Sequence, residues 1–405
     1  MNYLTFLRDN ARWLAACYLL TMFSGFGQTF FISLSGGDIR AEFGLSHGDF
    51  GLIYMVATLG SALTLPYIGK SVDYFPVHKV AAVVISGLAL SSFALASSTS
   101  IWVVVLALFG LRLCGQGMMT HMSMVAAARW FSAQRGRALS IAVLGFPSAE
   151  ASFPICFVAL SAALGWRSAW TVGSVILVLI ALPVLVTLLS KDRVPSAAEV
   201  AASKPEGRQW TRVEVLKDPL FWLTSLGVNA PGFIGTSIFF HQVYLVELRG
   251  WSLELFASAF LCMAVGVVIA SQVIGPLIDR YSARQLLPFT LIPLSLACLV
   301  LATIHAPYAA FLFMTLVGIS NGFNGTLVGA LWPEVYGTRN MGAIRSAAVS
   351  IMVFATAAGP GLVGWLIDIG VDFDHQIMVM SFYCIFMCFI MAGIRRVYQR
   401  REQSL

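Results

Sequence analysis

"IWVVVLALFGLRLCGQG" (Ile101–Gly117) is the stretch that decides the fold class of this chain. No charged side chain precedes Arg112 in it, and apolar residues return after Arg112. The hydrocarbon core of a bilayer is about 30 Å thick and a helix rises about 1.5 Å per residue, so about 20 apolar residues cross it. The stretch from about 102 to 128 meets this requirement. It therefore predicts a transmembrane helix with an arginine inside it.

The whole chain has the composition of a membrane protein. Of its 405 residues, 58% are hydrophobic and only 11% are charged, whereas soluble domains are about 45–50% apolar and about 25% charged. No region shows the short alternating segments of transmembrane strands. We predict an all-α membrane protein with twelve transmembrane helices, at roughly 13–35, 50–69, 79–97, 102–128, 138–160, 169–189, 220–246, 255–275, 285–305, 307–332, 346–367 and 376–394.

The basic residues predict the orientation of these helices. With the N-terminus inside, cytoplasmic loops and tails hold 21 of the 25 Lys and Arg residues, and the opposite side holds Arg40, Arg167 and Arg249. This asymmetry predicts a multi-pass protein of the cytoplasmic (inner) membrane with both termini in the cytoplasm. The net charge of +6 is then a topology signal, so no nucleic-acid partner is expected. The seven cysteines form no CxxC pair, so neither a disulfide framework, nor a metal site, nor another cofactor is expected.

The chain reads as two related halves. The polar stretch Lys191–Asp218 separates six predicted helices from six more, and "GKSVD" (69–73) returns as "GPLID" (275–279), 206 residues later. Eight residue pairs at the same offset are identical between 136–160 and 342–366. We therefore predict an N-terminal six-helix bundle (1–190), a cytoplasmic linker (191–218) and a pseudo-symmetric C-terminal six-helix bundle (219–405).

This tandem repeat and its loop motif resemble the major facilitator superfamily of transporters. In that family, the loop after the second helix reads Gly-x-x-x-Asp-Arg/Lys-x-Gly-Arg/Lys-Arg/Lys. The copy "GPLIDRYSAR" keeps Gly275, Asp279 and Arg280. The copy "GKSVDYFPVHK" keeps Gly69 and Asp73 but has no basic residue directly after the aspartate. The resemblance implies a fold of two six-helix bundles around a central site, with these loops acting as conformational latches.

A weaker resemblance concerns the branch of monocarboxylate and oxalate/formate transporters. It is carried by "ARWFSAQRGRALSIA" (128–142), "DPLFW" (218–222) and the Gly359–Pro360 pair. The branch often places substrate-binding cations in its eighth and eleventh helices, and the span 255–275 has none here. The resemblance implies an organic anion as the substrate.

Two charged residues are expected inside the membrane at similar depth. Arg112 lies about 15 Å from the outer edge of its helix, and Glu150 lies about 18 Å from the inner edge of the next helix. Each would cost about 2.5–3.5 kcal/mol in lipid, so both should face protein or water. They could form a static ion pair. Alternatively, Arg112 binds an anionic substrate or takes part in proton exchange, while Glu150 carries a proton; the sequence leaves these alternatives open.

Other polar residues fall on predicted helix faces that could line a transport path. At 100° per residue, Gln116 shares the face of Arg112, whereas His121 lies on the opposite face. The alternative for each residue is an interhelical hydrogen bond, typically worth about 0.6 kcal/mol in a membrane. The full set of candidates for substrate binding or proton coupling is Arg112, Glu150, Gln116, Gln28, Tyr54, His241, Tyr244, Asn321 and Asn324.

These features favour a secondary active transporter, not an enzyme. No Walker A sequence is present to bind ATP, so an ion gradient would supply the energy, and protons are expected because Glu150 and His241 can titrate. The predicted cargo is a small organic solute, a carboxylate anion, moved by alternating access by a monomer. The alternative is a proton-driven efflux antiporter for drugs, siderophores or metabolites.

Overall fold

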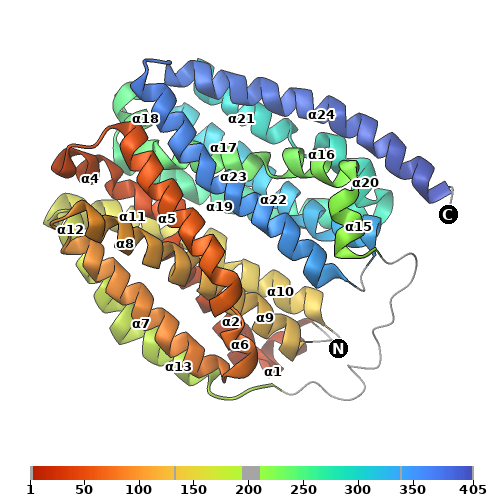
Figure 1. Cartoon of the computed structure of the whole chain (residues 1–405), viewed down its shortest axis with the longest axis horizontal. Helices are drawn as coiled ribbons and strands as arrows, with labels where there is room; N and C mark the ends of the chain where they lie inside the picture. The colour runs from red at the N-terminus through yellow and green to blue at the C-terminus, as the bar shows by residue number, and fades with distance from the viewer. Residues whose placement is uncertain (1–2, 132–133, 194–209, 338–339, 404–405) are drawn as a thin grey trace. The chain divides into compact units, whose positions relative to one another are not determined.

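The protein is helical throughout the part of the chain that the structure, a computed structural model, describes. That part comprises residues 3–131, 134–193, 210–337 and 340–403. Most of the predicted linker, 194–209, lies outside it. Eleven helices are long and apolar enough to cross a membrane, or up to twelve if one bent pair is a single span. The predicted all-α fold with twelve transmembrane helices is confirmed (Figure 1).

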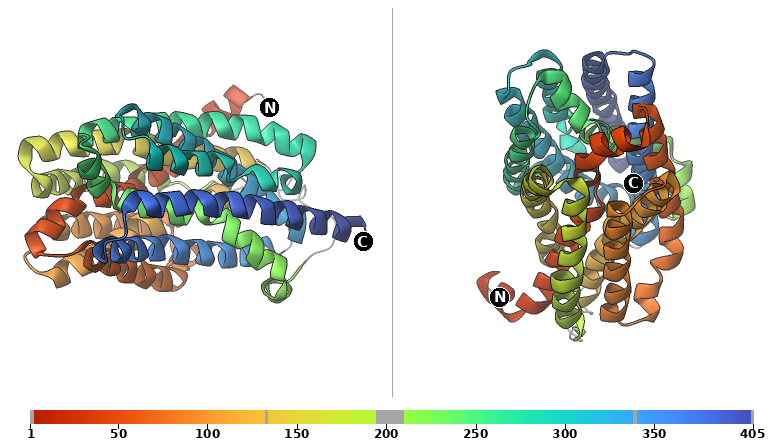
Figure 2. Two further views of the ribbon diagram at one scale, coloured as in Figure 1. Left: turned by 90° about the horizontal axis from the view of Figure 1, so that it is seen from above. Right: turned by 90° about the vertical axis from the view of Figure 1, so that its left-hand side faces the viewer.

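The chain divides into two compact units, and within each unit most helices run along one direction (Figure 2). Unit 1 comprises Met1–Leu45 and Ile53–Lys204, and unit 2 comprises Ser46–Leu52 and Pro205–Leu405. The helix α5 (His47–Ile68) therefore begins among residues of unit 2 and continues in unit 1.

Unit 1 is built from α1 to α13. In chain order its elements are α1 (Tyr3–Asp9), α2 (Ala11–Phe23), η1 (Ser24–Gly27), α3 (Thr29–Ile32), η2 (Ser33–Ser35), α4 (Gly36–Phe43), most of α5, α6 (Ser71–Tyr74), α7 (Val77–Ala96), α8 (Ile101–Gly110), η3 (Leu111–Met119), α9 (Thr120–Trp130), α10 (Arg135–Val143), α11 (Gly145–Leu164), α12 (Trp166–Ile176), η4 (Leu177–Ala181) and α13 (Leu182–Leu189). The segments α8, η3 and α9 together form one span, Ile101–Trp130.

Unit 2 contains the helices that follow the linker. They are α15 (Arg212–Lys217), α16 (Pro219–Val228), α17 (Ala230–Phe240), α18 (Gln242–Arg249), α19 (Leu253–Tyr281), α20 (Ala283–Leu286), η5 (Leu287–Phe289), α21 (Ile292–Thr303), α22 (Tyr308–Tyr336), α23 (Met341–Asp368) and α24 (Phe373–Gln403). In this unit α19 packs along α22, α21 along α24, and α17 along α23.

The two units share the repeat seen in the sequence. Gly44 ends α4 with a φ of +62° and Gly250 ends α18 with a φ of +63°, and these positions also differ by 206 residues. A left-handed residue after the last turn is the common way to end a helix, and glycine adopts it without steric cost. The same stop therefore ends the first membrane segment of each unit.

The first predicted helix is broken, which the apolar pattern did not indicate. Residues 13–35 were expected to form one helix, but Ala11–Gly27 and Thr29–Phe43 are bent by 44°. Gln28, between them, is extended, with φ −86° and ψ 152°. Gly25 and Gly27 just before it weaken the helix. The candidate residue Gln28 therefore lies at a break and not on a regular helix face.

Candidate functional site

Arg112 lies in the π-helix η3, in the middle of the span Ile101–Trp130. π-helical turns are wider than α-helical turns and occur frequently at functional sites. Because the turn is wider, the face assignment at 100° per residue does not hold through this segment. The sequence did not predict this local geometry.

The backbone of η3 touches the backbone of η1. A Cβ atom added at Gly27 would lie 2.2 Å from the carbonyl oxygen of Leu111 and 2.8 Å from Cα of Gly115. A Cβ atom added at Gly115 would lie 2.7 Å from Cα of Gly27. Only glycine fits at these two positions, so this crossing brings the carbonyl of Gly27 within reach of Arg112.

The Arg112 side chain is 1% exposed and has specific partners on one side only. Its Nη1 donates to the carbonyl oxygen of Gly27 at 3.0 Å, and its guanidinium lies 5.2 Å from the ring centroid of Tyr54. Tyr54 is itself held by a 2.6 Å hydrogen bond between its hydroxyl and that of Thr29. We call Arg112, Tyr54, Gly27 and Thr29 the Arg112 cluster.

Two donors of the guanidinium remain available. Among the described residues, Nε and Nη2 of Arg112 have no hydrogen-bond partner. Leaving a buried polar group without a partner costs about 1–3 kcal/mol, and more for a charged group. The cluster therefore holds a buried positive charge whose remaining donors favour an anionic acceptor.

A static ion pair between Arg112 and Glu150, one of the alternatives left open by the sequence, is not formed in this structure. The guanidinium is turned toward Gly27 and Tyr54. Glu150, in α11, is half-buried and makes no ion pair or hydrogen bond with the described residues. Its neighbour Ala149 packs against Gly25 of η1, at 2.9 Å from the position of an added Cβ atom. The two charges thus lie on helices that pack against η1 without joining each other.

Gln28 and Gln116 lie beside the Arg112 cluster. Gln28 directly follows Gly27 at the helix break, and the backbone nitrogen of Gln116 would lie 2.7 Å from a Cβ atom at Gly27. Both side chains are half-buried. The structure therefore brings together Arg112, Tyr54 and these two glutamines in unit 1.

His241 and Tyr244 belong to the first membrane segment of unit 2, which consists of α16, α17 and α18. They lie at its second break, between α17 and α18. His241 separates α17 from α18 and is 3% exposed, with Nδ1 2.9 Å from the carbonyl oxygen of Ser237. Its ring centroid lies 5.9 Å from that of His47, and the ring of Tyr244 lies 4.5 Å from that of His47. Together these rings form an aromatic group with Phe373.

The two asparagines of α22 have different surroundings. Asn324 donates from Nδ2 to the carbonyl oxygen of Val228 at 2.9 Å. Val228 is the last residue of α16, so this bond provides a donor for a carbonyl at the helix end, just before the break to α17. Asn321 is half-buried. The observed bond of Asn324 is an interhelical one, which is the structural alternative considered for it.

In the first loop motif, Asp73 makes an ion pair within unit 1. Its carboxylate lies 2.8 Å from Nη2 of Arg129, with both side chains well exposed. Exposed pairs of this kind contribute about 0–1 kcal/mol. Gly69 lies against His121, whose Nε2 would be 3.3 Å from an added Cβ atom. His121 thus faces the loop motif.

In the second loop motif, another residue makes the ion pair. The ion pair here joins Arg284 to the carboxylate of Glu334, at 2.5 Å. Arg280 lies over the ring of Tyr281 at 5.2 Å, and a Cβ atom at Gly275 would meet nothing within 4 Å. The two copies of the motif are therefore held by different contacts, and their role as latches stays a prediction.

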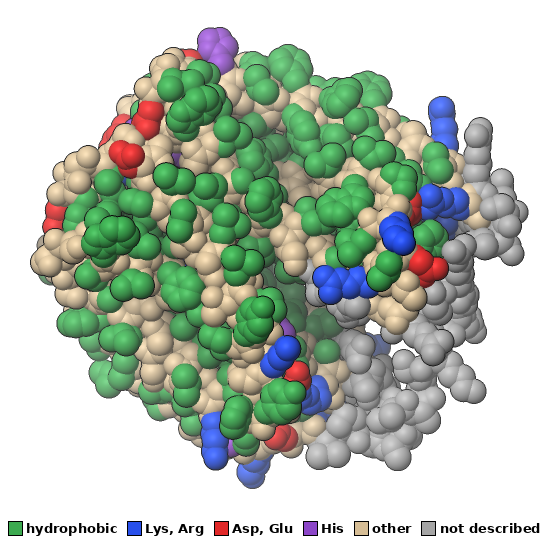
Figure 3. All heavy atoms as spheres, viewed as in Figure 1, with side chains coloured by type: hydrophobic (Ala, Val, Ile, Leu, Met, Phe, Trp, Pro, Cys, Tyr) green, Lys and Arg blue, Asp and Glu red, His purple; other side chains and the backbone are tan. Residues whose placement is uncertain are grey.

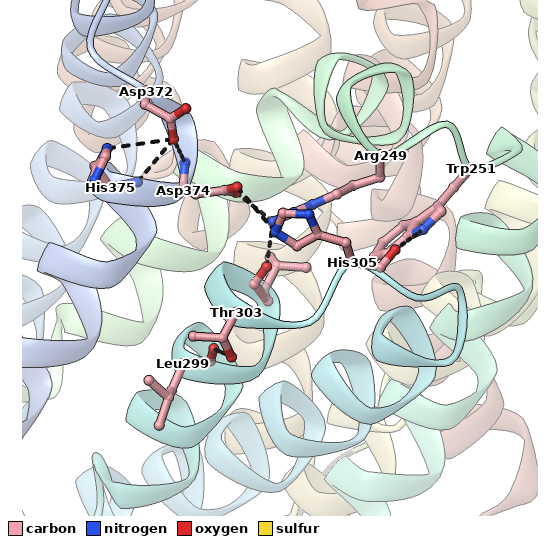
Figure 4. Close-up of polar contacts among 9 residues, drawn as sticks. Arg249, Trp251, Leu299, Thr303, His305, Asp372, Asp374 and His375 are labelled. Carbon is pink, nitrogen blue, oxygen red and sulfur yellow. Dashed lines mark hydrogen bonds and ion pairs between the residues drawn. The ribbon is translucent and has the colours of Figure 1, made fainter.

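Sequence reasoning missed an ionic cluster around the buried Arg249 at one end of unit 2 (Figure 4). Arg249, at the end of α18, donates to the carboxylate of Asp374 at 2.5 Å and to the carbonyl oxygen of Leu301 at 2.6 Å. The Arg249 side chain is 1% exposed. His305 approaches the same carboxylate at 3.6 Å. The cluster joins the end of α18, the loop between α21 and α22, and the start of α24. In the sequence, the only sign of it was that Arg249 is one of the few basic residues predicted to lie outside the cytoplasm.

A second missed residue is Asp368, at the end of α23. Its carboxylate accepts hydrogen bonds from the backbone nitrogens of His47, at 3.1 Å, and Gly48, at 2.7 Å. These nitrogens begin α5, where a helix carries a partial positive charge. All three residues belong to unit 2, so Asp368 is one of the contacts that join the start of α5 to it.

No group of three or more His, Cys, Asp or Glu side chains in the described ranges is placed to hold a metal ion. The polar site of unit 1 consists of Arg112 and the ring of Tyr54, with Gln28 and Gln116 beside them. Such a set suits the binding of an organic anion better than the coordination of a cation.

Comparisons with known proteins agree with the fold. A bacterial homologue of the human lysosomal transporter Spinster has 15% sequence identity and a TM-score of 0.71, with 96% of each chain covered. The nucleoside transporter NupG has 13% identity and a TM-score of 0.69, with 95% of this chain and 98% of that chain covered. At these identities the likeness shows the fold alone. No curated protein matches the chain by sequence.

The sequence profile of the Major Facilitator Superfamily matches residues 17–360, which is most of the chain. With the helical spans and the fold neighbours described above, this match confirms the resemblance stated from the loop motifs. The chain is a multi-pass integral membrane protein that belongs to the major facilitator superfamily.

Proposed function

We propose that this transporter carries a small organic carboxylate across the cytoplasmic membrane by alternating access and couples its movement to protons. One observation carries the proposal: the buried Arg112 has two donors without a partner among the described residues. Arginine stays charged under all ordinary conditions. A membrane protein that keeps such a charge in the middle of a span needs an anion or water there.

The two available donors are suited to a carboxylate. Nε and Nη2 lie on one edge of the guanidinium and present two parallel N–H groups, which match the two oxygens of a carboxylate. On the remaining sides, Nη1 donates to the carbonyl oxygen of Gly27, and one face of the guanidinium lies over the ring of Tyr54. These contacts fix the orientation of the group, so a substrate would meet a preorganised donor pair.

Alternating access supplies the route to this site. Arg112 is 1% exposed in this structure, so the substrate would reach it in another conformation. The break at Gln28 and the π-helix η3 lie beside the cluster. Both interrupt regular α-helix, and such interruptions are where helices bend. We propose that η1 and η3 rearrange to open the site.

Glu150 is the proposed proton carrier. It lies within the span Gly136–Leu164 and pairs with no basic side chain in the described part of the chain. A carboxyl group without a permanent partner can gain and lose a proton as its surroundings change. His241 is a second candidate, and its bond to Ser237 through Nδ1 fixes the ring orientation.

Uptake by the purified protein in liposomes tests the proposal. Monocarboxylates, dicarboxylates and cationic dyes are offered with and without a pH gradient, to the wild type, Arg112→Gln and Arg112→Lys. We expect carboxylate uptake, with at least a thirtyfold rise of KM in Arg112→Gln, because breaking a buried charged contact costs about 2 kcal/mol or more. Arg8→Gln removes an exposed charge of the same unit and should transport normally.

The remaining outcomes are also informative. Normal carboxylate uptake by Arg112→Gln would disprove the anion site. Transport of dyes but of no carboxylate would favour the efflux antiporter. Glu150→Gln should retain exchange of substrate for substrate but lose accumulation driven by the pH gradient. If that variant still accumulates substrate like the wild type, Glu150 is not the proton carrier.

A further inference from the structure

A groove lies between α21 and α24 in unit 2. Its volume is about 610 Å³. The two helices lie side by side (Figure 1). The lining residues come from η5 and α21 on one wall and from α24 on the other: Pro288, Phe289, Ile292, Ser295, Leu296, Ile385, Cys388, Phe389, Ala392, Arg395, Arg396 and Gln399.

The groove is apolar along most of its length and basic at one end. On α24, its lining residues recur every three or four positions from Ile385 to Gln399, so they form one face of that helix. Phe289, Ile292 and Phe389 are exposed apolar side chains, whereas Arg395 and Arg396 lie near the end of α24. Basic side chains also gather toward this end of the chain in Figure 3.

A polar contact joins the two walls on the side of the groove away from the arginines. The hydroxyls of Ser295 and Ser381 lie 3.0 Å apart, and each hydroxyl also donates to the other residue's carbonyl, at 3.1 Å and 2.8 Å. These bonds hold α21 and α24 together deep in the membrane segment. The serine contact therefore joins the two walls at this level.

The length of the groove corresponds to one leaflet of a bilayer. Ten residues separate Ile385 from Arg395 on α24, and a helix rises about 1.5 Å per residue, so they lie about 15 Å apart. The hydrocarbon core is about 30 Å thick, and one leaflet supplies half of it. Arg395 and Arg396 would then lie at headgroup level while the apolar walls lie at acyl-chain level.

The two arginines have no acidic counterpart in the described part of unit 2. The buried or half-buried carboxylates there pair elsewhere: Asp218 with Arg401, Glu334 with Arg284, and Asp374 with Arg249. No described carboxylate forms an ion pair with Arg395 or Arg396. Basic residues at a membrane surface attract anionic headgroups, each contributing about 1 kcal/mol.

We propose that this groove binds an anionic phospholipid, with its headgroup on Arg395 and Arg396 and one acyl chain between α21 and α24. A lipid satisfies both parts of the groove at once, because it joins a negative group to an apolar chain of the required length. A free phosphate ion would leave the apolar walls uncovered. The inference does not depend on the substrate or on the mechanism of transport.

Lipid binding to the purified full-length protein tests the proposal. Phosphatidylglycerol and phosphatidylcholine are added to the delipidated protein in neutral detergent, and bound lipid is counted by native mass spectrometry. We expect phosphatidylglycerol to bind the wild type more tightly, and Arg395→Gln/Arg396→Gln to weaken that binding about thirtyfold. Arg212→Gln/Lys217→Gln removes two exposed charges from α15 in the same unit and should bind like the wild type.

Two further variants separate charge from shape. Ala392→Trp places a large ring in the groove without changing the charge and should reduce phosphatidylglycerol binding. Arg395→Lys/Arg396→Lys keeps both charges and should retain most of it, which also controls for a folding defect in the glutamine variant. Equal binding of the two lipids to the wild type would overturn the proposal, as would an equal loss in the α15 variant or undiminished binding to Ala392→Trp.

Discussion

The close crossing of η1 and η3 is open to a direct test by Gly27→Ala. The new Cβ atom would lie 2.2 Å from the carbonyl oxygen of Leu111, and ordinary contact begins at 3.4 Å. The two segments must therefore separate by about 1.2 Å, the difference between these two distances. Because backbone blocks the new atom on more than one side, a change of side-chain rotamer cannot relieve the clash.

The shift has two energetic consequences. Overpacking a tight contact typically costs about 1–3 kcal/mol. The hydrogen bond from Arg112 to Gly27, now 3.0 Å long, would also stretch beyond bonding distance, leaving a third donor of a buried charge without a partner. We expect a loss of about 2 kcal/mol or more, which is roughly 4–8 °C in the unfolding temperature of a unit of this size.

Thermal unfolding in detergent measures this loss, and a thiol-reactive dye can follow it because Cys17, Cys298 and Cys384 are buried. The control is Gly136→Ala in the same unit, where an added Cβ atom meets nothing within 4 Å. Alanine favours a helix over glycine by about 1 kcal/mol, so the control should be neutral or slightly stabilising. An unfolding temperature of Gly27→Ala equal to that of the wild type would refute the described crossing.

Three other predictions concern the ion pairs. Burial raises the pKa of the Asp218 carboxyl, but hydrogen bonds from Arg401 and from the backbone outweigh it, so the pKa is lowered overall. The pair should therefore stabilise the protein above the unfolded-state pKa of about 3.9. This contribution should be lost as the pH falls through the lower folded-state pKa. When the free energy of unfolding is measured against pH, Asp218→Asn should show a smaller loss of stability in acid than the wild type. Asp374→Asn removes the partner of the buried Arg249 and should cost about 3 kcal/mol in chemical unfolding, and a loss below 1 kcal/mol would contradict the clustered geometry. Asp73→Asn breaks an exposed pair and should change the unfolding free energy by less than about 1 kcal/mol. A marked fall in the transport rate of this variant, at nearly unchanged stability, would therefore support its role as a latch.

The membrane class, the number of spans and the tandem repeat could be predicted from the sequence. A bilayer requires long apolar segments with satisfied backbone groups, so composition alone separates helices from loops. The same physics identified Arg112, because a charge within an apolar run is costly unless the protein needs it. Glu150 was noticed for the same reason.

The partners of these residues could not be predicted in this way. The pairing of Arg112 with Glu150 followed from equal depth on neighbouring helices, but depth does not fix the direction of a side chain. Arg112 lies in a π-helix, and its side chain contacts Gly27 and Tyr54 instead of Glu150. Similarly, Asp368 receives its hydrogen bonds from residues that are 321 and 320 positions away in the chain.

The amino-acid sequence by itself determined that this chain folds in a bilayer, where its helical spans lie, that its two halves are a repeat, and that Arg112 is buried in a span. The tertiary structure alone decided where the helices break, which backbones touch at Gly27 and Gly115, and which edge of the guanidinium stays available. The physical reason is that the cost of entering a bilayer adds up along the sequence, residue by residue. Contacts within the bundle depend on the shapes of segments that meet only after folding.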